Sequence, residues 1–152
     1  MMPQLQFPEA HFSFQQEGQR KLIYDIIRKK YVVLTPEEWV RQHVIHYLSS
    51  IQYPLGLIAV ERALKVNKLT KRTDIVVYNK KGAPALIVEC KSADVEVNQA
   101  VFDQIARYNM PLKVKWLMVT NGLMHYICEM DYEKRSYAFV NSLPDAQLLL
   151  TS

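Results

Sequence analysis

The sequence predicts an α/β fold with a mixed central β-sheet flanked by helices. Short runs rich in Val, Ile and Leu alternate with two amphipathic segments that are long enough to form helices. In chain order, the core segments give the arrangement αβββαβ, which places a helix on each side of a sheet. With 152 residues, 49% of them hydrophobic, we expect one core and one domain spanning residues 1–152.

An N-terminal β extension is expected to precede the core. The runs Leu22–Ile27 and Tyr31–Leu34 are rich in the β-branched and aromatic residues that strands favour. We therefore expect a strand arm over about residues 11–34 and the core over about residues 35–141.

The first core helix is expected to begin after Thr35 and to end near Ser50. Thr35 suits the N-cap, because its hydroxyl can accept a backbone N–H of the first turn. Pro36 suits the first helical position, and Glu38 would complete a capping box.

Three strands should follow this helix. The first is expected over residues 58–66, with Glu61 as its one acidic member. The other two are expected over 73–79 and 85–91, joined by a turn-rich loop that contains Gly82 and Pro84.

A second helix is expected over residues 95–108, because its apolar residues recur at helical spacing. Gln104 and Tyr108 are four residues apart and share one face of this helix. After it, Asn121-Gly122 predicts a two-residue type I′ hairpin, and a last strand is expected over 136–140.

The residues that carry chemistry are Asp74, near the start of one strand, and Glu89 and Lys91, at the end of the next. Glu89 and Lys91 project to one face of their strand, and Cys90 projects to the other. Charged groups at the end of a hydrophobic strand are costly to desolvate unless they are paired or bind a metal. Two carboxylates suit Mg²⁺, although a salt bridge at a strand end would explain the same residues.

Basic residues lead directly into the strand that carries Asp74. Lys68, Lys71 and Arg72 would attract phosphate near this site, while the net charge of +4 is too small to be informative by itself. Cations at these positions also serve solubility.

The D…E-x-K pattern of Asp74, Glu89 and Lys91 resembles the active site of the PD-(D/E)xK nucleases, which share the restriction-endonuclease-like fold; Thr73 replaces the proline of the family name. Gln104 and Tyr108 form a Q-x-x-x-Y motif that resembles the RecB-like branch of that superfamily.

Over roughly residues 20–130, the chain resembles the N-terminal nuclease domain of type I restriction enzyme R subunits, in a small stand-alone form. The motifs occur in the order Arg28–Val32, Leu34–Gln42, Arg72–Val77, Val88–Lys91, Gln104–Asn109 and Val119–Gly122. An R subunit continues into an ATP-driven translocase. This sequence has no G-x-x-x-x-G-K-[ST] phosphate loop, so ATP binding is not expected of it.

The resemblance implies a metal-dependent nuclease acting on DNA. Asp74 and Glu89 would hold Mg²⁺, or alternatively Mn²⁺, with the backbone carbonyl of Cys90 as a further ligand. Lys91 would orient the attacking water, and Gln104 and Tyr108 would support Lys91 or contact DNA.

An acidic residue on the first helix often joins the metal site in this superfamily. Glu38 is the candidate here, although its role in the cap explains it equally well. Glu61 could also reach the site, or could pair with a nearby arginine.

The alternative to an enzyme is a nucleic-acid-binding or assembly module that keeps the nuclease fold. Other restriction subunits are possible partners, as is a second copy in a homodimer. No apolar run is long enough to span a bilayer, and no signal peptide is seen. Cys90 and Cys128 form no disulfide or zinc pattern, so a reducing cytoplasm is expected.

Overall fold

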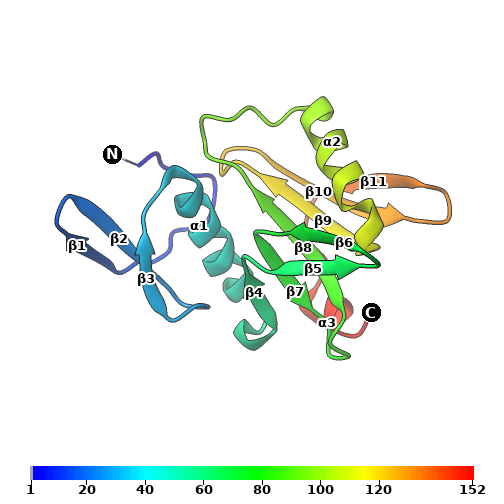
Figure 1. The fold of residues 1–152 in the computed structure, drawn as a ribbon, viewed down its shortest axis with the longest axis horizontal. Coiled ribbons are helices and arrows are strands. Elements are labelled where there is room, and N and C mark those ends of the chain that lie inside the picture. Colours follow the sequence, from blue (N-terminus) through cyan, green and yellow to red (C-terminus); the bar gives the residue numbers. More distant parts are fainter. Residues whose placement is uncertain (1) are drawn as a thin grey trace.

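The computed structural model describes residues 2–152. Its centre is a six-stranded sheet in the order β11-β10-β9-β8-β7-β4 (Figure 1). Neighbouring strands are antiparallel except for β8 and β9, which are parallel. The strands are β4 (Ile58–Val60), β7 (Ile75–Tyr78), β8 (Pro84–Cys90), β9 (Trp116–Thr120), β10 (His125–Asp131) and β11 (Ser136–Val140).

Helices cover both faces of this sheet. Helices α1 (Pro36–Ser50) and α3 (Ala146–Leu150) pack in the core on one face, and α2 (Gln99–Asn109) packs on the other. Residues of β8 alternate between these cores, so that Val88 and Cys90 face α1 whereas Ile87 faces α2. The same alternation turns Glu89 and Lys91 toward α2. The short 3-10 helices are η1 (Leu55–Leu57) and η2 (Met110–Leu112).

The start of α1 confirms the predicted N-cap. The hydroxyl of Thr35 accepts the backbone N–H of Glu38 at 3.0 Å, and Pro36 is the first helical residue. The carboxylate of Glu38 bonds to Arg28, Arg41 and Gln42 instead of returning to Thr35. Only one half of the capping box is therefore formed.

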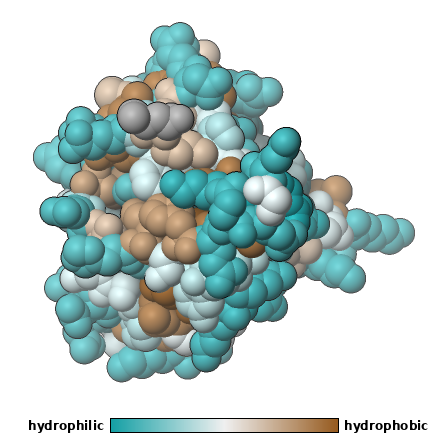
Figure 2. Space-filling model, turned by 90° about the vertical axis from the view of Figure 1, so that its left-hand side faces the viewer, coloured by the Kyte–Doolittle hydropathy of each residue, from teal (hydrophilic) through white to brown (hydrophobic). Residues whose placement is uncertain are grey.

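The N-terminal extension is a separate three-stranded antiparallel sheet of β1 (Phe14–Glu17), β2 (Arg20–Asp25) and β3 (Lys30–Val33). It lies beside α1, to which the preceding segment attaches through aromatic rings: the ring of Phe12 lies 5.3 Å from that of Trp39. Figure 2 views the molecule from this side and shows hydrophobic residues bordered by hydrophilic ones.

The predicted strand over residues 58–66 was wrong, because the chain turns at Glu61. Glu61 adopts a left-handed conformation with φ of 52°, and its N–H donates to the carbonyl of Asp74 at 2.8 Å. Beyond it, β5 (Ala63–Val66) leaves the central sheet and pairs with β6 (Leu69–Arg72) as a separate hairpin.

The predicted type I′ turn at Asn121-Gly122 was also wrong. That turn needs a positive φ at both residues, and of the two only Gly122 has one, at 87°. Four residues instead connect β9 to β10, and the Asn121 side chain accepts the N–H groups of Leu123 and Met124. Helix α2 begins four residues later than predicted, where the side chain of Asn98 caps it.

Gly122→Ala should lower the free energy of unfolding by about 1–3 kcal/mol. An added Cβ would lie 2.7 Å from the buried side chain of Leu5, at a backbone φ that favours glycine. Urea unfolding measures the change. Gly56→Ala is the matched control, since its Cβ would meet nothing within 4 Å. An equal loss in both variants would contradict this account.

Candidate active site

Asp74 and Glu89 lie opposite each other at the end of the β7–β8 pair. Ile75 pairs with Val88 in the antiparallel register, so one more step places Asp74 across from Glu89. Residues directly opposite share a sheet face, and like charges placed this way repel. The structure thus brings the two predicted carboxylates close together, with Glu89 on the face covered by α2 and Asp74 also in contact with α1.

Two hydrogen bonds hold the carboxylate of Asp74. Nη2 of Arg41 donates to its Oδ1 at 2.9 Å, and the backbone N–H of Cys90 donates to its Oδ2 at 2.8 Å. The Asp74 side chain thereby replaces a backbone carbonyl as the acceptor for the Cys90 N–H, just before β7 begins at Ile75. Its position is fixed by α1 and β8 together.

Glu89 has no such support. Its Oε1 is buried and has no hydrogen-bond partner within the described part of the chain. Burial, and then the negative charge of Asp74, raise the pKa of Glu89 to about 8, although the Lys91 ammonium opposes the shift. At neutral pH this carboxyl keeps a proton that a bound cation would replace.

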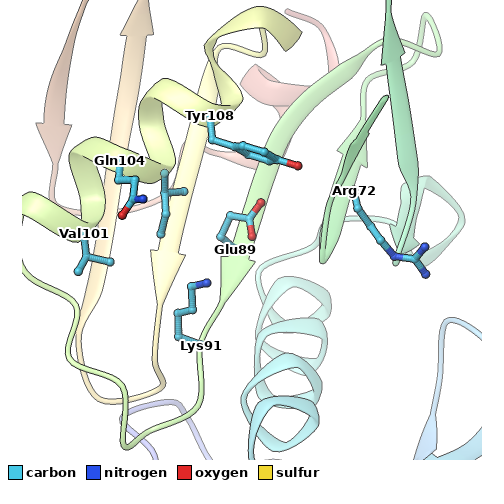
Figure 3. A pocket seen from close by; sticks show the side chains of 7 residues that line it. Arg72, Glu89, Lys91, Val101, Gln104 and Tyr108 are labelled. Carbon is cyan, nitrogen blue, oxygen red and sulfur yellow. The ribbon is translucent and has the colours of Figure 1, made fainter. Parts of the chain in front are cut away.

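A cavity of about 390 Å³ lies between β8, α2 and β6. Figure 3 shows Glu89 and Lys91 on the same side of β8, with Gln104 and Tyr108 extending from α2. The remaining lining residues are Arg72, Val101 and Ile105. Gln104 and Tyr108, the two α2 residues singled out from the sequence, therefore border the same pocket as Lys91, and 45% of Tyr108 is exposed.

The three predicted basic residues lie in different places. Nζ of Lys71 lies 3.9 Å from the ring centre of Tyr108. Arg72 borders the pocket, but its guanidinium is directed away from Glu89 in Figure 3. Lys68 is exposed at the turn between β5 and β6, away from the pocket lining.

Glu38 belongs to a buried ion-pair network. Its Oε1 accepts from Arg28 at 2.8 Å and from Arg41 at 2.7 Å, and its Oε2 accepts from Gln42 at 3.0 Å. Both oxygens are therefore engaged, which favours a structural role for Glu38. Glu61 lies 3.4 Å from Arg28 and 3.6 Å from Arg41. Of the two roles considered for it from the sequence, it has the contact with arginine.

Two residues near the site were missed by the sequence analysis. Arg41 ties Asp74 to α1, and hydrogen bonding to Asp74 and the charge of Glu38 raise its pKa despite its burial. Glu37 lies close enough to Asp74 that burial and this charge raise its pKa. Arg41 is four residues after Glu37 and contacts it at 3.2 Å. This i, i+4 spacing was the only signal in the sequence.

The donor set fits a cation that keeps much of its water. Within residues 2–152, no group of three or more His, Cys, Asp or Glu side chains is arranged as a preformed metal site. Two carboxylates face each other, however, and one has a buried oxygen without a partner. Mg²⁺ is commonly bound through one or two carboxylates plus waters.

The family model for the type I restriction enzyme R protein N terminus (HSDR_N) matches residues 36–144. The chain belongs to this family. The matched segment contains every residue of the pocket and excludes the three-stranded sheet.

A solved fragment structure, named as an HsdR subunit of a type I restriction enzyme from Vibrio vulnificus YJ016, is similar with a TM-score of 0.52 and 22% identity. The match covers 78% of this chain and 25% of that one. Comparison with curated proteins found no match. The fold is the predicted restriction-endonuclease-like α/β fold. Over residues 2–152, no helix has the length and hydrophobicity to cross a bilayer.

Glu89→Gln should stabilise the metal-free protein at pH about 8 and change it little at pH about 4. The folded chain holds a proton on Glu89 up to a pKa of about 8, whereas the ordinary value is 4.5. Between pH 4.5 and about 8, Glu89 loses its proton in the unfolded chain but keeps it in the folded chain. The free energy of unfolding of the wild type therefore falls as pH rises, by at most about 1.4 kcal/mol per pH unit. A glutamine side chain does not ionise, so the variant should not lose stability over this pH range.

Urea unfolding of wild type and Glu89→Gln across this pH range measures the difference. Glu96→Gln, at an exposed position, is the control. A constant difference between wild type and Glu89→Gln at all pH values would contradict the assigned titration.

Proposed function

We propose that this chain is a divalent-metal-dependent nuclease that hydrolyses phosphodiester bonds in DNA. The observation that carries the proposal is the proximity of Asp74 to Glu89, beside the ammonium of Lys91; the buried Oε1 of Glu89 has no hydrogen-bond partner among residues 2–152. A cation between the two carboxyl groups favours the ionised form of both, and a neighbouring lysine suits an anionic transition state.

Asp74 and Glu89 would hold Mg²⁺, and Mn²⁺ would also fit these oxygen ligands. The backbone carbonyl of Cys90 is the third proposed ligand. In a strand, the N–H and C=O of one residue point to the same neighbour, and the N–H of Cys90 donates to Asp74. A bound divalent cation supplies Lewis-acid polarisation of the phosphoryl oxygens and lowers the pKa of bound water.

Lys91 acts on the substrate in this proposal. Its ammonium orients the attacking water and stabilises the negative charge that develops on the phosphoryl oxygens. Gln104 keeps this side chain in place from α2, since both line one pocket. Glu37 is the acid on α1 that comes near Asp74, and it would add negative charge beside a bound cation.

The proposed partners follow from the family. An R-protein N-terminal domain is a component of a type I restriction system, so DNA and other restriction subunits are the proposed partners. A homodimer is compatible with them, and such a system acts in the cytoplasm. The phosphate-loop motif of ATP-driven motors is missing from the sequence.

The second candidate function is a nucleic-acid-binding module without catalysis. Arg41 favours it, because its guanidinium already neutralises Asp74 at 2.9 Å. A chain whose metal ligand has a permanent cationic partner can keep the fold and bind DNA without a metal. Cleavage assays separate the two functions.

Lys91→Ala should lower the rate of Mg²⁺-dependent cleavage by about 10²–10³-fold and leave folding almost unchanged, because it removes a charge that stabilises the transition state. Asp74→Asn should also stop cleavage, by removing a metal ligand. The assay incubates each protein with linear, branched and single-stranded DNA in Mg²⁺, Mn²⁺ or EDTA. Lys80→Ala, an exposed lysine in the β7–β8 loop, is the control.

Two outcomes would count against the assigned site. Equal cutting by wild type and Lys91→Ala would indicate a contaminating nuclease or a different active site. Binding of DNA without cutting, with every metal and with restriction subunits added, would favour the non-catalytic module.

Metal binding should release a proton and tighten with rising pH. Because the pKa of Glu89 is raised to about 8 in the metal-free chain, a cation must displace its proton below that pH. The apparent affinity should rise up to about tenfold per pH unit and level off above pH about 8. Calorimetric titration with Mn²⁺ in buffers of different ionisation enthalpy measures the proton count, and a pH-independent affinity would contradict the assignment.

A further inference from the structure

The β5–β6 hairpin stands apart from both other sheets. Its base is fixed by the hydrogen bonds from Glu61 to Asp74 and from Thr73 to Arg62. Above the base, Leu64 packs at the edge of the core under α2, and Lys71 contacts Tyr108. A two-stranded hairpin is only marginally stable by itself, so these contacts determine where it lies.

The hairpin carries a concentrated positive charge. From Arg62 to Arg72 there are five basic residues and no acidic one. Four of them are exposed, and Lys71 is half-buried. The five are Arg62, Lys65, Lys68, Lys71 and Arg72.

None of these five cations forms an ion pair within the described residues 2–152. The contrast with α1 and β2–β3 is clear, because Arg28 and Arg41 there each contact several carboxylates. Unpaired cations on a projecting element raise its local potential and attract a polyanion.

The contact between Lys71 and Tyr108 connects the hairpin to the pocket. Figure 3 shows the ring of Tyr108 extending from α2 over the strand that carries Glu89. Lys71 meets this ring from the hairpin at 3.9 Å. A cation held over an aromatic ring gains only a small stabilisation at an exposed site. This contact is weak enough that a phosphate can replace the ring as the partner of Lys71.

We propose that the β5–β6 hairpin is a phosphate-binding arm that holds the DNA backbone next to the pocket, and that Tyr108 is its docking point on α2. The inference rests on the proposed function for its substrate, since the hairpin borders the pocket through Arg72. Lys65 and Lys68 bind phosphates outside the pocket, and Lys71 exchanges the Tyr108 ring for a phosphate when DNA is bound. Tyr108 is thus a positioning residue.

The first test measures binding without cleavage. Wild type, Lys65→Gln/Lys68→Gln and Lys80→Gln/Lys81→Gln are titrated in EDTA with labelled single-stranded and duplex DNA at several salt concentrations. Each double variant removes two positive charges, and Lys80 and Lys81 lie in the separate β7–β8 loop. The hairpin variant should lose about one unit of log–log salt slope per phosphate contact, and the control should keep the wild-type slope.

The second test measures the docking point. Tyr108→Leu removes the ring and should speed hydrogen exchange of the β5–β6 amides, whereas Tyr108→Phe keeps the ring and should leave the exchange at the wild-type rate. Equal exchange in both variants would overturn the docking role. This readout does not depend on metal or on DNA.

The outcomes separate this inference from the proposed nuclease activity. If the Lys65/Lys68 variant loses salt slope but no metal supports cleavage by wild type, the phosphate-binding arm is supported and the nuclease function is contradicted. If wild type cuts DNA and the hairpin variant binds and cuts equally well, the arm is overturned and the nuclease function stands. Absence of DNA binding by wild type, or equal displacement of DNA by poly-glutamate at matched charge, would also overturn the arm.

Discussion

The position of the Asp74 carboxylate is the constraint on which the rest of the site depends. Its side chain accepts from α1 through Arg41 and from β8 through the N–H of Cys90. Its backbone carbonyl accepts the N–H of Glu61, where the chain turns out of the central sheet into the β5–β6 hairpin. The register of β7 with β8 then sets Glu89 against it. A helix, two strands and a hairpin therefore meet at one residue.

The N-terminal sheet is connected to Asp74 by a series of buried ion pairs. Asp25, which is fully buried in β2, accepts from the side chains of Arg28 and Gln42. Arg28 contacts Glu38, which contacts Arg41, which contacts Asp74. Each buried charge in this series has a partner of opposite sign, as burial requires. The geometry of Asp74 is thereby coupled to the loop between β2 and β3.

Much of this could be predicted from the sequence, because strand periodicity is local. Alternation along 85–91 places Glu89 and Lys91 on one face and Cys90 on the other, as the two cores confirm. The break at Glu61 could not be predicted, since no glycine or proline marks it and its φ of 52° depends on a bond to distant Asp74. The roles of Glu37 and Glu38 depend on how α1 is rotated against the sheet, and the partners that fix this rotation come from other elements.

The parallel pairing of β8 with β9 has a consequence for how the chain is made. The backbone N–H of Lys91 is held by the carbonyl of Thr120 at 2.8 Å, and α2 is the crossover that joins the two strands. Parallel strands require such a crossover, so their pairing must wait until the whole connection has been synthesised. A nascent chain that ends before Thr120 can pair β7 with β8, but it lacks the carbonyl that holds the backbone of Lys91. The backbone of Lys91 therefore takes its final position only after the chain through Thr120 has been synthesised.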